Sequence, residues 1–372
     1  MFKQLAPRAT ILLPSAIMKF KTPFATFCWL LSLAAFANAE APKIESISAP
    51  ATVTTVTTAA TAATAATVTT KSLTYMDAVV LGLVEGLTEY LPVSSTGHLI
   101  LANAFLDLDG DTAMLDADGS PITVIGHDGN ERPYTIGEAA YAYTIVIQAG
   151  AILAVVYLYW KSIIGIIMGC LGRDANGRKL AINLVAAFIP AAVIGLLLDD
   201  WIEAKLGNNI AAVAGALIVG AIVMLVVERW RKRGQQSAIA ADDGPELHDL
   251  PLSKAIMIGF FQCFAMWPGT SRSMATIVGG YIAGLSPARA AEFSFLLGLI
   301  TLTAASGYKF VSDGGNMLSA LQVGPVLVGC LVAFVSATLA VKWLVGYLSQ
   351  HGLAVFAWYR ILLAIVVFWA IA

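Results

Sequence analysis

Charged side chains are scarce in this sequence. Asp, Glu, Lys and Arg make up 12% of its 372 residues, about half the share that soluble domains carry. With 58% apolar residues and a mean hydropathy of +0.78, the composition excludes a soluble enzyme and a disordered chain. The net charge of −2 excludes the basic surface that nucleic acid requires. We therefore expect a polytopic helical membrane protein, because a helix satisfies its own backbone in lipid.

Cysteine is also rare. No CxxC pair or metal-ligand spacing occurs, and we expect free, buried thiols rather than a disulfide framework. The four cysteines, which stand mostly in apolar runs, are Cys28, Cys170, Cys263 and Cys330.

The N-terminal region has the order of a secretory signal. Two lysines precede an apolar run and an A-x-A site that ends at Ala39, so residues 1–39 predict a signal peptide, with Met18 as an alternative start. A short membrane anchor is the other interpretation. Residues 40–75 predict a linker rich in Ala and Thr, which leaves residues 76–372 as the membrane-embedded domain.

Six apolar runs are long enough to cross a bilayer. Two more apolar segments, 76–106 and 254–285, are interrupted at Pro92 and Pro268, where a helix must break. Irregular backbone at membrane depth survives only inside protein or beside a wet cavity, so both segments predict re-entrant helix pairs. The fold class expected is an all-α polytopic membrane protein with about six transmembrane helices and two such pairs. The six runs lie near residues 143–160, 181–198, 210–227, 293–308, 324–341 and 354–371.

The chain repeats itself at a shift of 177 residues, which aligns Ser94 with Ser271 and Glu85 with Gln262. Each half then holds one interrupted segment and three spans. An odd number of spans forces the second half to insert upside down. This is the inverted-repeat plan of transporters, in which broken helices meet near the midplane and form the site.

The loops differ in charge, which predicts their sides of the membrane. Basic residues cluster at 229–233 and again in the 161–180 loop, so we expect both loops in the cytoplasm. Residues 107–142 carry eight acidic residues against Arg132 alone, and we expect them outside. The Asp-rich turns there lack the closing Glu of a full calcium loop, so residues 107–140 predict a solvated insertion.

Two glutamates stand in the first interrupted segment. Glu85 and Glu89 are four residues apart in a helix that ends near Pro92, so they share one face, about 6 Å apart. Carboxylates inside a membrane segment are energetically costly, so we expect them to be functional. The pair can hold a divalent cation, Mg²⁺ or Ca²⁺, or keep one proton between them. A polar helix face is the plain alternative.

Hydroxyls and an imidazole follow in the broken backbone. A Ser beside a His can act as a nucleophile with its base, or the His can protonate a leaving group. Amides at the start of the next half-helix attract anions. Helix capping by Ser and Thr is the alternative. The residues are Ser94, Ser95, Thr96 and His98.

Arg272 is the only charged residue over positions 255–288. Its planar guanidinium group, a fork of N–H donors, can donate two hydrogen bonds at once to phosphate oxygens. An ion pair with Glu85 or Glu89 is the alternative, and it too would bring the two interrupted segments together. The hydroxyls around it are further candidates for phosphate binding: Ser271, Ser273 and Thr276.

Other polar residues in or beside the spans are expected to join helices rather than to form the site. They are Gln148, Glu292, Ser294, Tyr359 and Arg360. The carboxylates, hydroxyls, histidine and arginine of the two broken segments together predict a phosphate-bearing amphiphile as ligand.

Both broken segments resemble signatures of one family. VEGLTEYLPVSSTGH, from Val84 to His98, closely resembles the first signature of the bacterial undecaprenyl-diphosphatases, also called bacitracin-resistance proteins. WPGTSRSMAT, from Trp267 to Thr276, resembles the second, and VIQAGAILAV and EFSFLL also fit. The resemblance covers roughly residues 76–372.

This resemblance implies hydrolysis of undecaprenyl diphosphate to undecaprenyl phosphate and inorganic phosphate. That reaction recycles the lipid carrier of cell-wall synthesis and confers bacitracin resistance. The resemblance also implies a divalent cation and a site that opens to the periplasm from the inner membrane. Carried over, Glu85 and Glu89 form the acidic motif, and Arg272 binds phosphate. Ser95 is the expected nucleophile, with a metal-activated water as the alternative, and His98 is its proton-transfer partner.

A lipid-phosphate transporter or flippase without enzymatic activity is the rival function, since inverted repeats suit transport. The discriminating set is Glu85, Glu89 and His98, because a carrier needs cationic counter-charges rather than carboxylates beside a hydroxyl and a base. The expected partners are the bilayer and the lipid diphosphate, without nucleic acid. The oligomeric state stays open, with a homodimer among the candidates.

Overall fold

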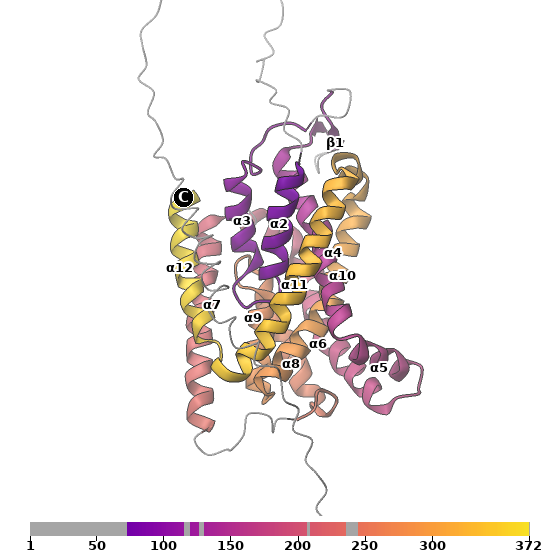
Figure 1. Cartoon of the computed structure of the whole chain (residues 1–372), viewed down its shortest axis with the longest axis vertical. Helices are drawn as coiled ribbons and strands as arrows, with labels where there is room; N and C mark the ends of the chain where they lie inside the picture. The colour runs from indigo at the N-terminus through magenta and orange to yellow at the C-terminus, as the bar shows by residue number, and fades with distance from the viewer. Residues whose placement is uncertain (1–72, 115–119, 126–129, 207–208, 236–244, 372) are drawn as a thin grey trace, which may run out of the picture. The chain divides into compact units, whose positions relative to one another are not determined.

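The computed structural model describes residues 73–114, 120–125, 130–206, 209–235 and 245–371 (Figure 1). The signal peptide and nearly all of the linker predicted upstream lie outside these residues. Within them the chain folds into eleven α-helices, two short strands and two 3-10 turns. The all-α polytopic class is confirmed, because five of these helices are long and apolar enough to cross a membrane.

The six predicted spans correspond to α4, α6, α7, α10, α11 and α12, of which α12 is a shorter apolar helix than the other five. The elements in chain order are α2 (Tyr75–Thr88), α3 (Ser95–Phe105), β1 (Thr123–Ile125), β2 (Glu131–Pro133), α4 (Ile136–Leu158), α5 (Trp160–Cys170), α6 (Ala175–Leu206), α7 (Ile210–Gln235), η2 (Leu247–Asp249), α8 (Leu252–Cys263), η3 (Phe264–Met266), α9 (Arg272–Ala283), α10 (Pro287–Ala320), α11 (Val323–His351) and α12 (Ala354–Ile371).

The two interrupted segments form helix pairs, α2 with α3 and α8 with α9, and the members of each pair pack together. Each is broken where proline stands, because proline cannot donate the helical hydrogen bond. The shift of 177 residues carries the first residue of α2 onto that of α8, and Ser95 onto Arg272. Figure 1 shows one pair in the upper part of the bundle and the other in the lower part, as an inverted repeat requires.

Helices of one half also pack against helices of the other half in a symmetric pattern. α2 packs on α11 and α8 on α6, while α7 packs on α12. A Cβ on Gly82 would lie 2.6 Å from the Gly329 carbonyl oxygen, and one on Gly259 would collide with the Ala187 carbonyl. Gly82 and Gly259 are related by the same shift. Both half-helices therefore approach their partners at a distance that only glycine allows.

The prediction that residues 161–180 form a loop is wrong, because α5 occupies much of that range. This helix turns back on the start of α6, with which it packs (Figure 1). A Cβ on Gly177 would overlap the Gly165 carbonyl. Small residues on both helices therefore permit a tight helical hairpin, which the basic residues of the segment did not reveal.

The described parts of the acidic insertion contain regular structure and buried side chains, unlike a wholly solvated loop. β1 and β2 pair antiparallel, with Val124 opposite Arg132. Leu108, Met114 and Tyr134 are buried in one cluster with residues of α2 and α4. The insertion is therefore anchored by apolar side chains spaced among its acids, a pattern too sparse to be recognised as a strand or helix.

The thiols at Cys170, Cys263 and Cys330 are free, as expected. The expectation that they are buried is wrong for Cys170, which is exposed, and the other two are only half-buried. An apolar run that faces lipid is apolar without being covered by protein, so hydropathy alone overstated burial. Cys28 lies outside the described residues.

Candidate active site

The two serines that cap the N-termini of the half-helices α3 and α9 have left-handed backbone conformations. Ser94 has φ 75° and Ser271 has φ 72°, a region that costs a non-glycine residue energy and clusters at functional sites. Each hydroxyl accepts a backbone hydrogen bond from its own helix, from Gly97 and Met274 respectively. The alternative of helix capping therefore describes both side chains in this structure.

A partly buried cluster joins the two halves of the chain. Arg272 Nη2 donates to Glu89 Oε1 over 3.2 Å. Ser95 Oγ donates to the other carboxylate oxygen, Glu89 Oε2, over 2.7 Å. The acidic and hydroxyl groups of the first signature thus meet the arginine of the second, 183 positions further along the chain.

The guanidinium of Arg272 lies in a slot that α10 provides. Its Nη1 donates to the Ser294 carbonyl over 2.8 Å, and the group stands 5.3 Å from the centre of the Tyr90 ring. A Cβ on Gly298 would overlap the guanidinium. Among the described residues its Nε is buried without a hydrogen-bond partner. The slot therefore fixes the plane of the fork, and the bonds to Ser294 and Glu89 use two of its five N–H donors.

Glu85 lies deeper, with 1% of its surface exposed. The backbone amide of Glu89 donates to the Glu85 carbonyl over 2.9 Å, so helical spacing persists between the two acids, as predicted. Gln148 Nε2 donates to Glu85 Oε1 over 3.3 Å, and the Ser306 hydroxyl donates to the side-chain oxygen of the same glutamine. Gln148 was expected only to join helices, but here it contacts a site residue.

The oxygens of this site match the hard ligands that Mg²⁺ and Ca²⁺ prefer. Among the described residues no group of three or more His, Cys, Asp or Glu side chains could hold a metal ion. A cation here would therefore need oxygens beyond those of Glu85 and Glu89. Mg²⁺ is commonly held in that way, by one or two carboxylates together with substrate phosphates.

His98 is on α3, one turn beyond Ser94. Its Nδ1 lies 2.6 Å from the Ser94 carbonyl oxygen, and its Nε2 lies 2.7 Å from the Tyr359 hydroxyl. Ser95 is bonded instead to Glu89. The structure thus places the predicted hydroxyl and histidine in the same segment but gives each a different partner.

The remaining phosphate-binding candidates divide into two kinds. Thr96 is exposed. Ser273 and Thr276 are fully buried, and their hydroxyls are bonded inside the protein, to the Leu91 carbonyl at 2.7 Å and to the Ser294 hydroxyl at 2.7 Å. Ser273 therefore joins the two halves and Thr276 joins α9 to α10, so both hydroxyls are used in contacts within the protein in this structure.

Arg360 is the largest fully buried side chain in the described part of the protein. Its guanidinium donates to the Pro92 carbonyl over 3.5 Å and to the Gly269 carbonyl over 3.0 Å, one from each broken segment. Two further bonds go to carbonyls of α7. Sequence reasoning assigned it only to helix contacts, although an ionisable residue within a span is by itself a signal of function.

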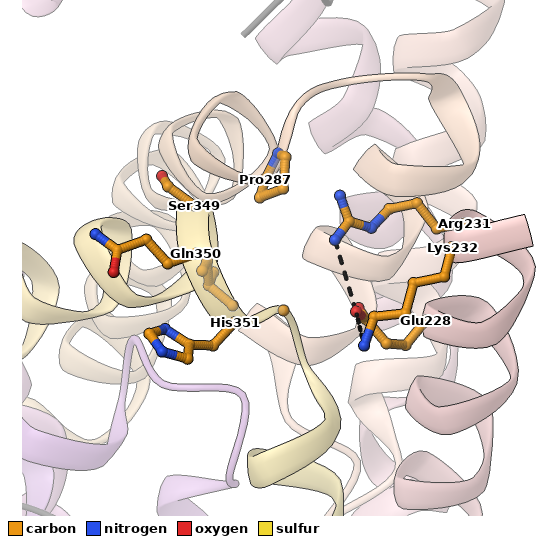
Figure 2. Close-up of a pocket in the computed structure, with 9 residues that line it drawn as sticks. Glu228, Arg231, Lys232, Pro287, Ser349, Gln350 and His351 are labelled. Carbon is orange, nitrogen blue, oxygen red and sulfur yellow. Dashed lines mark ion pairs between the residues drawn. The ribbon is translucent and has the colours of Figure 1, made fainter. Parts of the chain in front are cut away.

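A separate hollow of about 200 Å³ lies at another place, between the ends of α7 and α11 (Figure 2). Glu228 there is ion-paired with Arg231 and Lys232. Its carboxylate also accepts a hydrogen bond from the backbone of Leu353, at the start of α12. None of the residues predicted for the site lines this hollow, whose acid serves to tie helix ends together.

Comparison with known proteins gives one consistent result. A family model described as Bacitracin resistance protein BacA matches residues 78–366. An undecaprenyl-diphosphatase of Sorangium cellulosum is 44% identical over 79% of this chain and 86% of its own. Those of Acinetobacter baumannii and Clostridium tetani are 40% and 38% identical, each over 78% of this chain and 93% of their own. The chain therefore belongs to the family of the Bacitracin resistance protein BacA.

Proposed function

We propose that this membrane protein hydrolyses undecaprenyl diphosphate to undecaprenyl phosphate and inorganic phosphate. The reaction recycles the lipid carrier of cell-wall synthesis and confers resistance to bacitracin. One observation carries the proposal beyond family membership: Ser95, Glu89 and Arg272 form a bonded set where the two broken segments meet. A hydroxyl, its proton acceptor and a cation for phosphate oxygens are what this hydrolysis needs.

Ser95 supplies the attacking oxygen in this mechanism. Its hydroxyl already donates to Glu89 Oε2 over 2.7 Å, so Glu89 is placed to accept the proton as the oxygen attacks the terminal phosphorus. The bond from that phosphorus to the bridging oxygen breaks, and undecaprenyl phosphate leaves. Water then cleaves the phosphoserine ester and releases inorganic phosphate. A water molecule in the position of the Ser95 hydroxyl, deprotonated by the same carboxylate, is the alternative nucleophile.

Arg272 stabilises the charge on the terminal phosphate. Its position is set by Ser294 and by the close approach of Gly298, so little reorganisation accompanies the reaction. His98 accepts a proton from the water that cleaves the phosphoserine ester and gives it to the inorganic phosphate that leaves, while Glu89 returns its proton to the Ser95 oxygen. Glu85 and Glu89 are the residues that would hold Mg²⁺ or Ca²⁺ beside the diphosphate. When bound, such a cation neutralises phosphate charge and polarises the bridging bond.

We propose that the protein lies in the bacterial inner membrane with its site open to the periplasm. The basic residues at 229–233 and the acidic insertion support this orientation. Single cysteines placed at exposed Glu131 and exposed Arg229 provide the test, read with a membrane-impermeant maleimide on intact spheroplasts. We expect labelling at position 131 only. Labelling at position 229 only would contradict this orientation and indicate the opposite one. The homodimer remains a prediction, to be checked by mass measurement in detergent.

The decisive assay is phosphate release from a polyprenyl diphosphate by purified protein, with and without chelator. We expect release that the chelator suppresses and that Glu89→Ala abolishes. Glu131→Ala is the matched control, because it removes an exposed acid on β2 and should leave the rate unchanged. Bound lipid without any release by folded wild-type protein would refute the enzyme and favour a carrier.

A further inference from the structure

Both ring nitrogens of His98 have a partner. Nδ1 lies 2.6 Å from the Ser94 carbonyl oxygen, which can only accept a hydrogen bond, so Nδ1 carries a hydrogen. Nε2 lies 2.7 Å from the Tyr359 hydroxyl. In the neutral ring Nε2 has no hydrogen and therefore accepts from the tyrosine. The surroundings thus select one of the two tautomers.

Tyr359 comes from α12, an element outside both signature motifs. Its ring is nearly parallel to that of His98, with an interplanar angle of 9° and centroids 5.6 Å apart. The next residue, Arg360, is bonded to carbonyls of both broken segments. The hydroxyl is therefore held in place by the same helix that ties the site together.

We propose that Tyr359 is a positioning residue for the diphosphatase reaction, acting through His98. Its hydroxyl keeps the ring in the tautomer whose Nε2 is the basic atom. When Nε2 gains a proton, the new N–H donates to the same tyrosine oxygen, whose own hydrogen rotates to another direction. One geometry thus serves both protonation states of His98, and no bond of the tyrosine is broken.

This inference rests on the proposed function, and Tyr359→Phe separates it from a role in packing. Phenylalanine keeps the ring against His98 and removes only the hydroxyl. If the ring alone mattered, the variant would keep wild-type activity. If the hydroxyl positions His98, we expect kcat to fall roughly tenfold, the loss expected for one hydrogen bond, with KM nearly unchanged.

A double-mutant cycle with His98→Gln tests whether the effect passes through the histidine. We expect Tyr359→Phe to lower kcat in the wild-type background and to cause no further loss once His98 is replaced. An equal loss in both backgrounds would overturn the proposal. Tyr143→Phe is the matched control, because it removes a buried hydroxyl bonded over 3.0 Å to the Pro325 carbonyl and should leave kcat unchanged.

A readout without turnover distinguishes this proposal from the proposed function. In protein labelled with ¹⁵N-histidine, the His98 signals are those lost in His98→Gln. We expect them to report the tautomer protonated at Nδ1 in the wild type and a mixture in Tyr359→Phe. A mixture already in the wild type, or no change in the variant, would overturn the role of Tyr359. Absence of phosphate release would refute only the diphosphatase activity.

Discussion

Replacing Arg272 by lysine tests whether the protein needs a fork or merely a positive charge. The guanidinium bonds to Glu89 and to the Ser294 carbonyl at the same time, and it lies over the Tyr90 ring. A lysine ammonium is a compact charge that can keep the pair with Glu89 but not this planar geometry. We therefore expect Arg272→Lys to fold and to lose activity.

The size of the loss follows from the bonds that lysine cannot make. A hydrogen bond to a charged group contributes about 1.5–3 kcal/mol, which corresponds to roughly a 10- to 150-fold decrease in kcat/KM. Arg272→Ala removes the charge as well, and we expect a larger loss, on the order of 1,000-fold. It also leaves Glu89 buried without its partner, which destabilises a protein by about 3–5 kcal/mol.

Phosphate release from a polyprenyl diphosphate is the assay, with kcat and KM determined for both variants. Monodisperse elution in detergent confirms that each compared protein is folded. Arg272→Lys with wild-type kcat/KM would refute the reasoning, because the arginine would then act only as a counter-charge. Equal losses in the two variants would show that the retained charge contributes nothing.

Further substitutions probe other contacts of the site. Glu89→Gln removes the charge that accepts the Ser95 proton, and we expect kcat to fall about 100-fold or more in the phosphate assay. Gly298→Ala places a Cβ on the Arg272 guanidinium, so we expect kcat to fall roughly tenfold. Gly307→Ala is the control on the same helix, because open space surrounds that position, and it should leave kcat unchanged. Arg360→Met leaves buried carbonyls unpaired, each worth about 1–3 kcal/mol, and should lower both the thermal unfolding temperature and the rate; an unchanged unfolding temperature would contradict its structural role.

The breaks in the fold could be predicted from the sequence because their cause is local. Pro92 and Pro268 each marked a break, although a proline does not end every helix, since Pro190 lies inside α6. The shift of 177 residues then related the two broken segments. The same reasoning gave two outcomes for Arg272, a phosphate ligand or an ion pair with a glutamate. The structure contains the ion pair with Glu89, an arrangement that also leaves the arginine at the predicted site.

The partners of the site residues could not be predicted, because they depend on packing between distant helices. Ser95 and His98 are close in sequence, and a base paired with its nucleophile was the natural expectation. In the fold Ser95 bonds to the end of α2, whereas His98 contacts α12. Tyr359 carried only a weak signal, since polar residues within spans more often join helices. Arg360 was assigned to helix contacts as well, although its charge within a span indicated function.

The order of synthesis gives the position of Arg360 a consequence for biogenesis. Both broken segments precede α12 in the chain, yet their carbonyls reach Arg360 only after this helix has been inserted. An incompletely synthesised chain therefore has both signature motifs in the bilayer, joined by contacts such as those of Arg272 with Glu89 and of Ser273 with Leu91, but without the bonds from Arg360. These bonds form in a late step of insertion, so the site reaches its full set of supporting contacts only when α12 is in place.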